Sequence, residues 1–122
     1  MRLFVILYNM ASNEEKELKE NIEEFKSSAI IAKEKGDYNV SATLFFKALA
    51  VLSDLYIFKK QGKIPSSHSE RFKILETEYP EIYLILDKDF PFYQQSYRMK
   101  LTKEISEVLK EDVNKLIELL KE

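Results

Sequence analysis

The sequence contains no cysteine, no tryptophan and a single histidine, His68. The absence of cysteine excludes disulfides, zinc–thiolate centres, iron–sulfur clusters and thiol catalysis. One imidazole without a thiol partner does not make a structural metal site, so the sequence predicts neither a bound metal nor a cofactor. A chain without cysteine also fits the reducing cytoplasm, which is the expected location.

Glycine, proline and strong net charge are scarce as well. Two glycines and three prolines leave few breaks for a fold built from strands and turns. A net charge of −2, from 19 basic and 21 acidic residues, excludes a general nucleic-acid polycation. The apolar run at residues 3–8 is too short to span a bilayer, so no membrane partner is expected.

What the chain does contain is 45% hydrophobic and 33% charged residues over 122 positions. This length fits one domain, which would bury roughly two-thirds of the surface that its unfolded chain exposes. We expect a single domain over residues 1–122, with residues 1–11 as an apolar N-terminal extension.

A first long helix is predicted from about Asn13 to Lys35. Ser12 and Glu15 have the spacing of a capping box, which marks a helix start. Gly36 supplies a left-handed stop. Between these signals, one apolar stripe recurs at spacings of four and three, formed by Leu18, Ile22, Phe25, Ala29 and Ala32.

A second long helix is predicted over residues 38–61, with Asp37 as its N-cap and Gly62 as its stop. Its apolar residues cover more than one face. A helix of this kind is either central in a bundle or shared with a second copy of the chain. We therefore expect a homodimer, which would also cover the apolar residues 3–8.

The second half of the chain is predicted to hold shorter helices. Ser67 and Glu70 form another capping box, which places His68 in the first turn of a third helix. That helix ends before Pro80, which begins a short fourth helix. Residues 87–91 are predicted to form a loop. A final helix is marked by Ile105, Val108, Leu109, Val113, Leu116, Ile117 and Leu120.

These patterns predict an all-α fold, an up-and-down antiparallel bundle of about five helices, two of them short. The Gly36-Asp37-Tyr38 turn, the aromatic and alanine-rich segment 42–49 and the connector 62–68 resemble the HEPN family of small helical domains. The resemblance covers about Lys16 to Glu118. It implies a bundle that commonly dimerises. Many family members lie beside a minimal nucleotidyltransferase, and others are metal-independent ribonucleases.

The ribonuclease members use an arginine followed, after four to six residues, by a histidine late in the domain. Here Arg98 is the late arginine, and residues 103–105 hold no histidine; none follows Arg71 either. The resemblance therefore implies a non-catalytic module that binds a nucleotide or a nucleotidyltransferase partner. Two alternatives remain open. One is a divergent ribonuclease of a toxin–antitoxin system that uses His68 with Arg71 or Arg98, and the other is a dimeric scaffold without a ligand.

The candidate ligand-binding residues lie in two groups. Residues 59–73 hold five basic residues against one acidic residue, and a helix N-terminus beside them is a plausible phosphate cradle. After Pro91, the aromatic rings of Tyr93 and Tyr97 and the guanidinium of Arg98 offer a surface on which a base of a nucleotide or RNA could stack. The competing interpretation is a solvated connector and side chains that seal the bundle. The candidate residues are Lys63, His68, Arg71, Tyr97 and Arg98.

Overall fold

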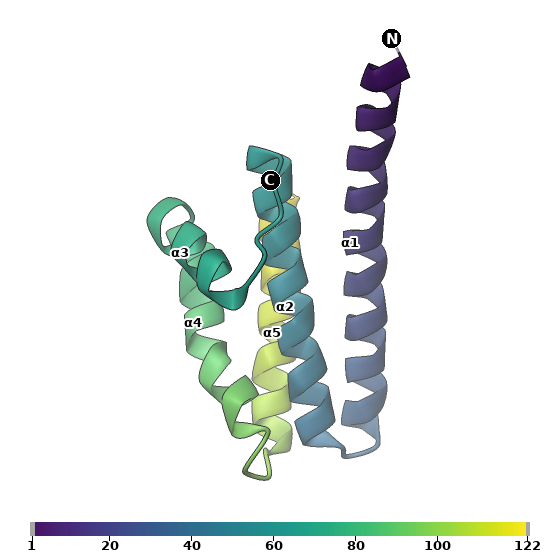
Figure 1. Ribbon diagram of the computed structural model, residues 1–122. Helices are drawn as coiled ribbons and strands as arrows, with labels where there is room; N and C mark the ends of the chain where they lie inside the picture. The colour runs from purple at the N-terminus through teal and green to yellow at the C-terminus, as the bar shows by residue number, and fades with distance from the viewer. Residues whose placement is uncertain (1, 122) are drawn as a thin grey trace.

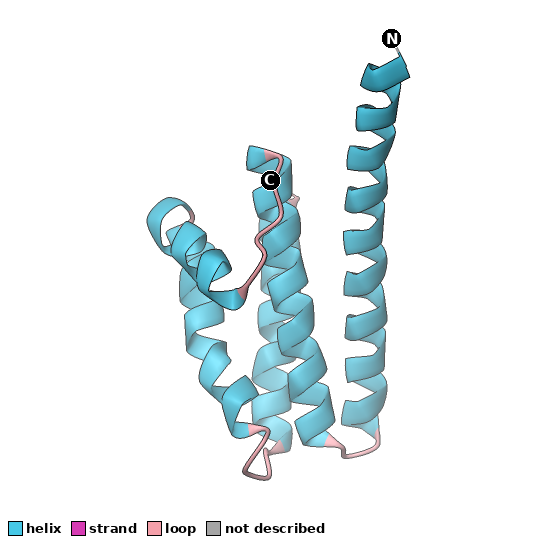
Figure 2. Cartoon of the chain, in the orientation of Figure 1, coloured by secondary structure: helices cyan, strands magenta, loops and turns pink. Residues whose placement is uncertain are grey.

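The chain folds into five α-helices in the computed structural model, which describes the backbone of residues 2–121 and the side chains of residues 13–121 (Figures 1 and 2). Over the described backbone no strand occurs, so the predicted all-α bundle is confirmed. Of the two helices predicted to be short, one has 11 residues and the other 16. The helices are α1 (Arg2–Glu34), α2 (Tyr38–Gln61), α3 (His68–Glu78), α4 (Pro80–Gln95) and α5 (Lys103–Leu120).

Glycines end the first two helices as predicted. Gly36, with φ 81°, follows α1, and Gly62, with φ 73°, follows α2. This left-handed conformation is strained for any residue with a β-carbon. Asp37 occupies the N-cap position of α2, but its side chain makes no capping hydrogen bond. The backbone N–H of Asp37 instead donates to the carbonyl of Ala32 at 2.9 Å, which closes the end of α1.

The predicted start of the first helix is wrong, because α1 begins at Arg2 rather than near Asn13. Residues 3–11 contain no glycine or proline that would stop a helix, so the capping signal at Ser12 lies inside a longer one. The Glu15 carboxylate instead pairs with the Nζ atoms of Lys19 and Lys59 at 3.4 Å each. The packing of the predicted extension, residues 1–11, lies outside the described side chains.

The central helix of the bundle is α2, which packs against α1, α4 and α5. Phe45, Phe46 and Leu49 are buried on it, and the small Ala42 and Ala48 allow neighbouring helices to approach closely. Within the described residues, α2 is also the one helix with the length and apolar content of a membrane span. Because α2 is mostly buried inside the bundle, its core position accounts for that composition.

A buried pair of hydroxyl groups ties three helices together. The Oγ of Ser41 on α2 donates to the carbonyl of Ala29 on α1 at 2.8 Å, and it lies 2.7 Å from the Oγ of Ser106 on α5. A hydroxyl has only one proton to donate, so Ser106 donates to Ser41. The chain of hydrogen bonds satisfies both buried hydroxyls and fixes the relative positions of α1, α2 and α5.

The loop predicted at residues 87–91 is wrong, because α4 runs unbroken from Pro80 to Gln95 with Pro91 inside it. A proline inside a helix removes the hydrogen bond to the carbonyl four residues earlier, here that of Asp87. Pro91 and Asp87 are both exposed, so water can satisfy this carbonyl and the helix continues. The helical path turns Asp89 into the core, since positions i and i+2 of a helix face different sides.

Candidate functional site

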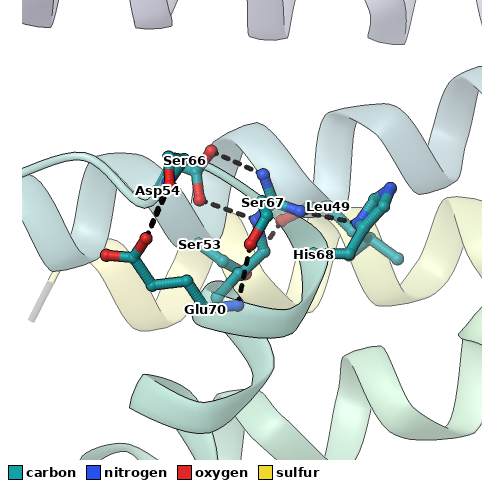
Figure 3. Close-up of polar contacts among 8 residues, drawn as sticks. Leu49, Ser53, Asp54, Ser66, Ser67, His68 and Glu70 are labelled. Atoms are coloured by element: carbon teal, nitrogen blue, oxygen red, sulfur yellow. Dashed lines mark hydrogen bonds and ion pairs between the residues drawn. The ribbon is translucent and has the colours of Figure 1, made fainter.

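The connector after α2 brings the start of α3 beside the middle of α2. Residues 62–67 run back along α2 before α3 begins (Figure 1). The Ser67 Oγ accepts from the N–H of Glu70 at 3.1 Å, and the Glu70 carboxylate accepts from the N–H and Oγ of Ser66 at 3.2 and 2.7 Å (Figure 3). The predicted capping box is confirmed, with its return contact on Ser66 instead of Ser67. It fixes His68 as the first residue of α3.

Three polar side chains form an array from the core to the surface. The Arg71 guanidinium donates from Nε to Oδ1 of Asp54 at 2.7 Å and from Nη2 to Oδ2 at 2.9 Å. The Asp54 and Arg71 side chains are only 8% and 11% exposed, so this two-pronged ion pair is largely desolvated. The Nη1 of Arg71 lies 2.7 Å from Nδ1 of His68, which is exposed. The array therefore anchors the imidazole to α2.

The array also sets the protonation of His68. Arginine can only donate, so Nδ1 of the imidazole accepts, and the neutral ring carries its proton on Nε2. Partial burial of the ring, followed by the positive charges of Arg71 and Lys47, lowers the pKa of His68 below its ordinary value of 6.5. At neutral pH the exposed imidazole therefore presents a hydrogen-bond donor rather than a base.

Aromatic rings from α2 and α4 lie around the imidazole. The centroid of His68 is 6.4 Å from that of Phe46, 5.7 Å from that of Phe90 and 6.2 Å from that of Tyr93. Tyr93 stacks on the buried Phe46 at 5.0 Å. Tyr97 meets Tyr93 edge-on at 5.8 Å, with their hydroxyl oxygens 3.2 Å apart. His68 and Tyr97 thus both contact the ring of Tyr93.

The turn after α4, residues 96–101, is held by one side chain from the start of α2. The Nδ2 of Asn39 donates to the carbonyls of Ser96 and Met99 at 2.9 and 2.6 Å. The Oδ1 of Asn39 accepts from the N–H of Leu101 at 2.8 Å. These three hydrogen bonds to backbone groups give the turn a defined conformation, although it is largely exposed.

The same turn borders a shallow hollow of about 690 Å³. Tyr97 is 74% exposed there, and the guanidinium-bearing Arg98 is exposed next to it. An exposed ring beside a guanidinium and side-chain amides is a surface on which a base can stack and form hydrogen bonds. The other lining residues are Pro91, Gln94, Gln95 and Met99.

The structure brings together three of the five predicted ligand-binding residues. His68 and Arg71 are in direct contact, and Tyr97 joins them through the ring of Tyr93. Arg98 makes no hydrogen bond, ion pair or ring contact with His68 among the described side chains. Lys63 lies in the exposed connector, where its charge contributes, after the hydrogen bonds from Ser66, to lowering the pKa of Glu70.

Sequence reasoning missed the two side chains that position this surface, Asp54 and Asn39. Asp54 does carry a signal in the sequence, because it is the one acidic residue in the apolar stretch 48–58 of the second predicted helix. A charge at such a position is retained only when it is paired. Asn39 gave no such signal, since its bonds reach a turn almost sixty residues later in the chain.

Acidic residues do not form a metal site in the described part of the chain. Within residues 13–121 no three acidic or histidine side chains converge as metal ligands do. Asp87 is exposed whereas Asp89 is buried, so these neighbours do not share a site.

Comparison of the chain with protein-family models, with curated proteins and with solved structures found no match. The resemblance to the HEPN family therefore rests on the sequence features alone.

Proposed function

We propose that this protein is a non-catalytic HEPN-type module that binds a nucleotide on the surface formed by the start of α3 and the end of α4. The observation that carries the proposal is the Asp54–Arg71 pair, which fixes His68 as a hydrogen-bond donor at a helix N-terminus. The family resemblance supplies the expected partner protein, a minimal nucleotidyltransferase.

The phosphate of the nucleotide is assigned to the start of α3. The Nε2–H of His68 and the positive end of the helix both favour an anion there. The ammonium of Lys47 is exposed and close enough to act on the pKa of His68, so it adds a positive charge on the α2 side. The base is assigned to Tyr97 and Arg98, which lie beyond the ring of Tyr93.

The geometry disfavours the ribonuclease alternative. A general base at His68 would have to accept a proton on Nε2, which requires the ring proton to move to Nδ1 and breaks the contact with Arg71. Of the two arginines that could assist, Arg71 contacts the imidazole but is held by Asp54 through two hydrogen bonds. Arg98 lies in the hollow at residues 96–101 and has no described contact with the imidazole. We therefore place the binding module ahead of the enzyme.

Titration with ATP, AMP and inorganic phosphate, followed by amide NMR shifts, tests the proposal. All three ligands are expected to shift residues 66–71, and only the nucleotides are expected to shift residues 93–99. His68→Ala should weaken ATP binding about tenfold or more, because a hydrogen bond to a charged group contributes about 1.5–3 kcal/mol. Tyr97→Ala should weaken ATP binding and leave phosphate binding unchanged.

Lys115→Ala is the matched control, since it removes one exposed positive charge from α5. It is expected to leave ATP binding unchanged. The absence of shifts at residues 66–71 with millimolar ATP would contradict the binding module.

RNA incubated with the protein without metal is expected to remain intact. Cleavage that both His68→Ala and Arg98→Ala abolish would establish the ribonuclease instead.

We also propose a homodimer that forms through α1. At 1.5 Å per residue the 33 residues of α1 span about 50 Å and the 24 residues of α2 about 36 Å. The N-terminal part of α1 extends past the other helices (Figure 1). The apolar residues around α2 do not require a second copy of the chain to cover them. Within one chain, only Val40 of the large apolar residues on α2 is exposed. On α1, Ile31 is 52% exposed.

Light scattering at micromolar concentration is expected to give twice the mass of one chain. Ile31→Glu and deletion of residues 2–10 should each shift the protein toward the mass of one chain. A full-length protein that is monomeric at this concentration would contradict the dimer. A dimer without any nucleotide-induced shift would favour the ligand-free scaffold.

A further inference from the structure

The contact between α4 and α5 contains a buried acidic pair that the candidate ligand surface does not use. Asp89 on α4 is fully buried and lies on the same helix face as Ile82 and Ile85. Asp112 on α5 is 8% exposed and lies between the fully buried Leu109 and Leu116. Two facing apolar stripes thus each place a carboxylate in the core, where an apolar residue would be expected.

The carboxylates of Asp89 and Asp112 both face one ammonium group, that of Lys88, and the charge of Asp112 acts on Asp89. No donor among the described residues hydrogen-bonds to either oxygen of Asp89. Ionised carboxylates only accept, so a hydrogen bond between Asp89 and Asp112 requires one proton on the pair. Without that proton, two negative charges would face each other in a buried contact.

The surrounding charges neutralise only one member of the pair. The Nζ of Lys88 lies 2.8 Å from Oδ2 of Asp112 and 3.9 Å from Oδ1 of Asp89. On α5, Glu111 acts on Lys88, and Lys115 shares with Asp112 and Glu81 a hollow of about 420 Å³. Among the described residues, α2 and α3 bring no charge that acts on Asp89. A single lysine therefore leaves the second carboxylate dependent on a proton.

We propose that the proton shared by Asp89 and Asp112 controls the docking of α4 on α5, and through it the surface that α3 and α4 present. With the proton in place, the two helices pack closely. Its loss separates the helices enough for water to reach both carboxylates. The effect on ligand binding rests on the proposed function, whereas the docking of α4 does not.

The electrostatics place the loss of the shared proton near physiological pH. Burial, followed by the contact with Asp112 and its charge, raises the pKa of Asp89 from 3.8 to about 8. Between these values the folded protein holds a proton that the unfolded chain releases. The stability that the proton contributes is complete below about pH 4, declines as the pH rises and is lost above about pH 8.

Urea denaturation of wild type, Asp89→Asn and Asp87→Asn between about pH 6.5 and 9 tests this. The folding equilibrium constant of wild type is expected to fall by up to tenfold per pH unit until about pH 8, as one proton requires, and then to level off. Asp89→Asn keeps the shape of the side chain and supplies an N–H donor to Asp112, so the fall in stability toward pH 8 should be absent in this variant. Asp87→Asn, on the exposed side of the same helix, should follow wild type. A wild type without pH dependence would overturn the proposal.

Amide hydrogen exchange shows which contact opens. Above about pH 8, protection is expected to fall in α4 of wild type, to persist in α1 and α2, and to persist everywhere in Asp89→Asn. An equal loss of protection in all helices would overturn the control of docking.

If Asp89→Asn does not fold, carboxyl carbon NMR of wild type decides, since titration of Asp89 near pH 4 would refute the shared proton. ATP affinity should fall over the same range in wild type and in Asp87→Asn, but not in Asp89→Asn. Absence of ATP binding at every pH would reject the proposed function and leave the exchange result standing.

Discussion

Replacing Asp54 with alanine is expected to lower the free energy of unfolding by about 3–5 kcal/mol. The Arg71 guanidinium makes two hydrogen bonds to this carboxylate, and both side chains are nearly inaccessible to water. Removal of the carboxylate leaves a buried positive charge between α2 and α3 without its partner. A domain of this size is stabilised by only about 5–15 kcal/mol, so the loss should be plain in urea denaturation at neutral pH.

The matched control replaces both partners. Asp54→Leu combined with Arg71→Leu removes the buried charges together and is expected to recover most of the lost stability, because an apolar pair has no desolvation penalty. His68→Ala, at an exposed position, should stay within about 0.5 kcal/mol of wild type. A loss below about 1 kcal/mol in Asp54→Ala would show that water satisfies Arg71, which contradicts the buried array.

The Asp54 variant also reveals how His68 is held. In wild type the imidazole is expected to be the Nε2–H tautomer, since Arg71 donates to Nδ1. In Asp54→Ala the guanidinium loses its anchor, and imidazole nitrogen shifts should report a mixture of tautomers. An unchanged tautomer would show that the aromatic rings around His68, rather than Arg71, set its state.

The helix ends that the sequence predicts correctly are set by local chemistry. Gly36 and Gly62 adopt the left-handed conformation that stops a helix, and Ser67 caps α3 through the N–H of Glu70. Each of these interactions involves residues at most four or five apart. Because each of these interactions depends on a few neighbouring residues, it can be read from the sequence.

The errors arise where tertiary context overrides a local signal. Pro91 stays inside α4 because the carbonyl that loses its donor is on the exposed side, a fact that depends on how the whole helix packs. The candidate surface depends likewise on long-range contacts. His68 meets Asp54 through Arg71 only because the connector after α2 turns back along that helix (Figure 1). No local pattern encodes that path.

Replacing Phe46 with alanine is expected to lower the free energy of unfolding by about 3–5 kcal/mol and also to abolish nucleotide-induced shifts. Phe46 is 1% exposed, and its ring lies 5.0 Å from Tyr93 and 5.6 Å from Phe90. The cavity left by truncation removes the support of Tyr93, on which both His68 and Tyr97 pack. Thermal unfolding measures the stability, and ATP titration at a temperature where the variant is folded measures binding.

Phe45→Ala separates these two effects. Phe45 is buried as completely as Phe46 on the same helix, but its ring makes no contact with the aromatic rings at the candidate site. Phe45→Ala should therefore lower the free energy of unfolding by about the same 3–5 kcal/mol, while ATP binding persists in the folded fraction. If both variants lose binding equally, the site depends on overall stability alone. If neither loses it, the aromatic cluster does not position the ligand surface. Only loss confined to Phe46→Ala supports a ring-to-ring connection from the core of α2 through Tyr93 to the exposed Tyr97.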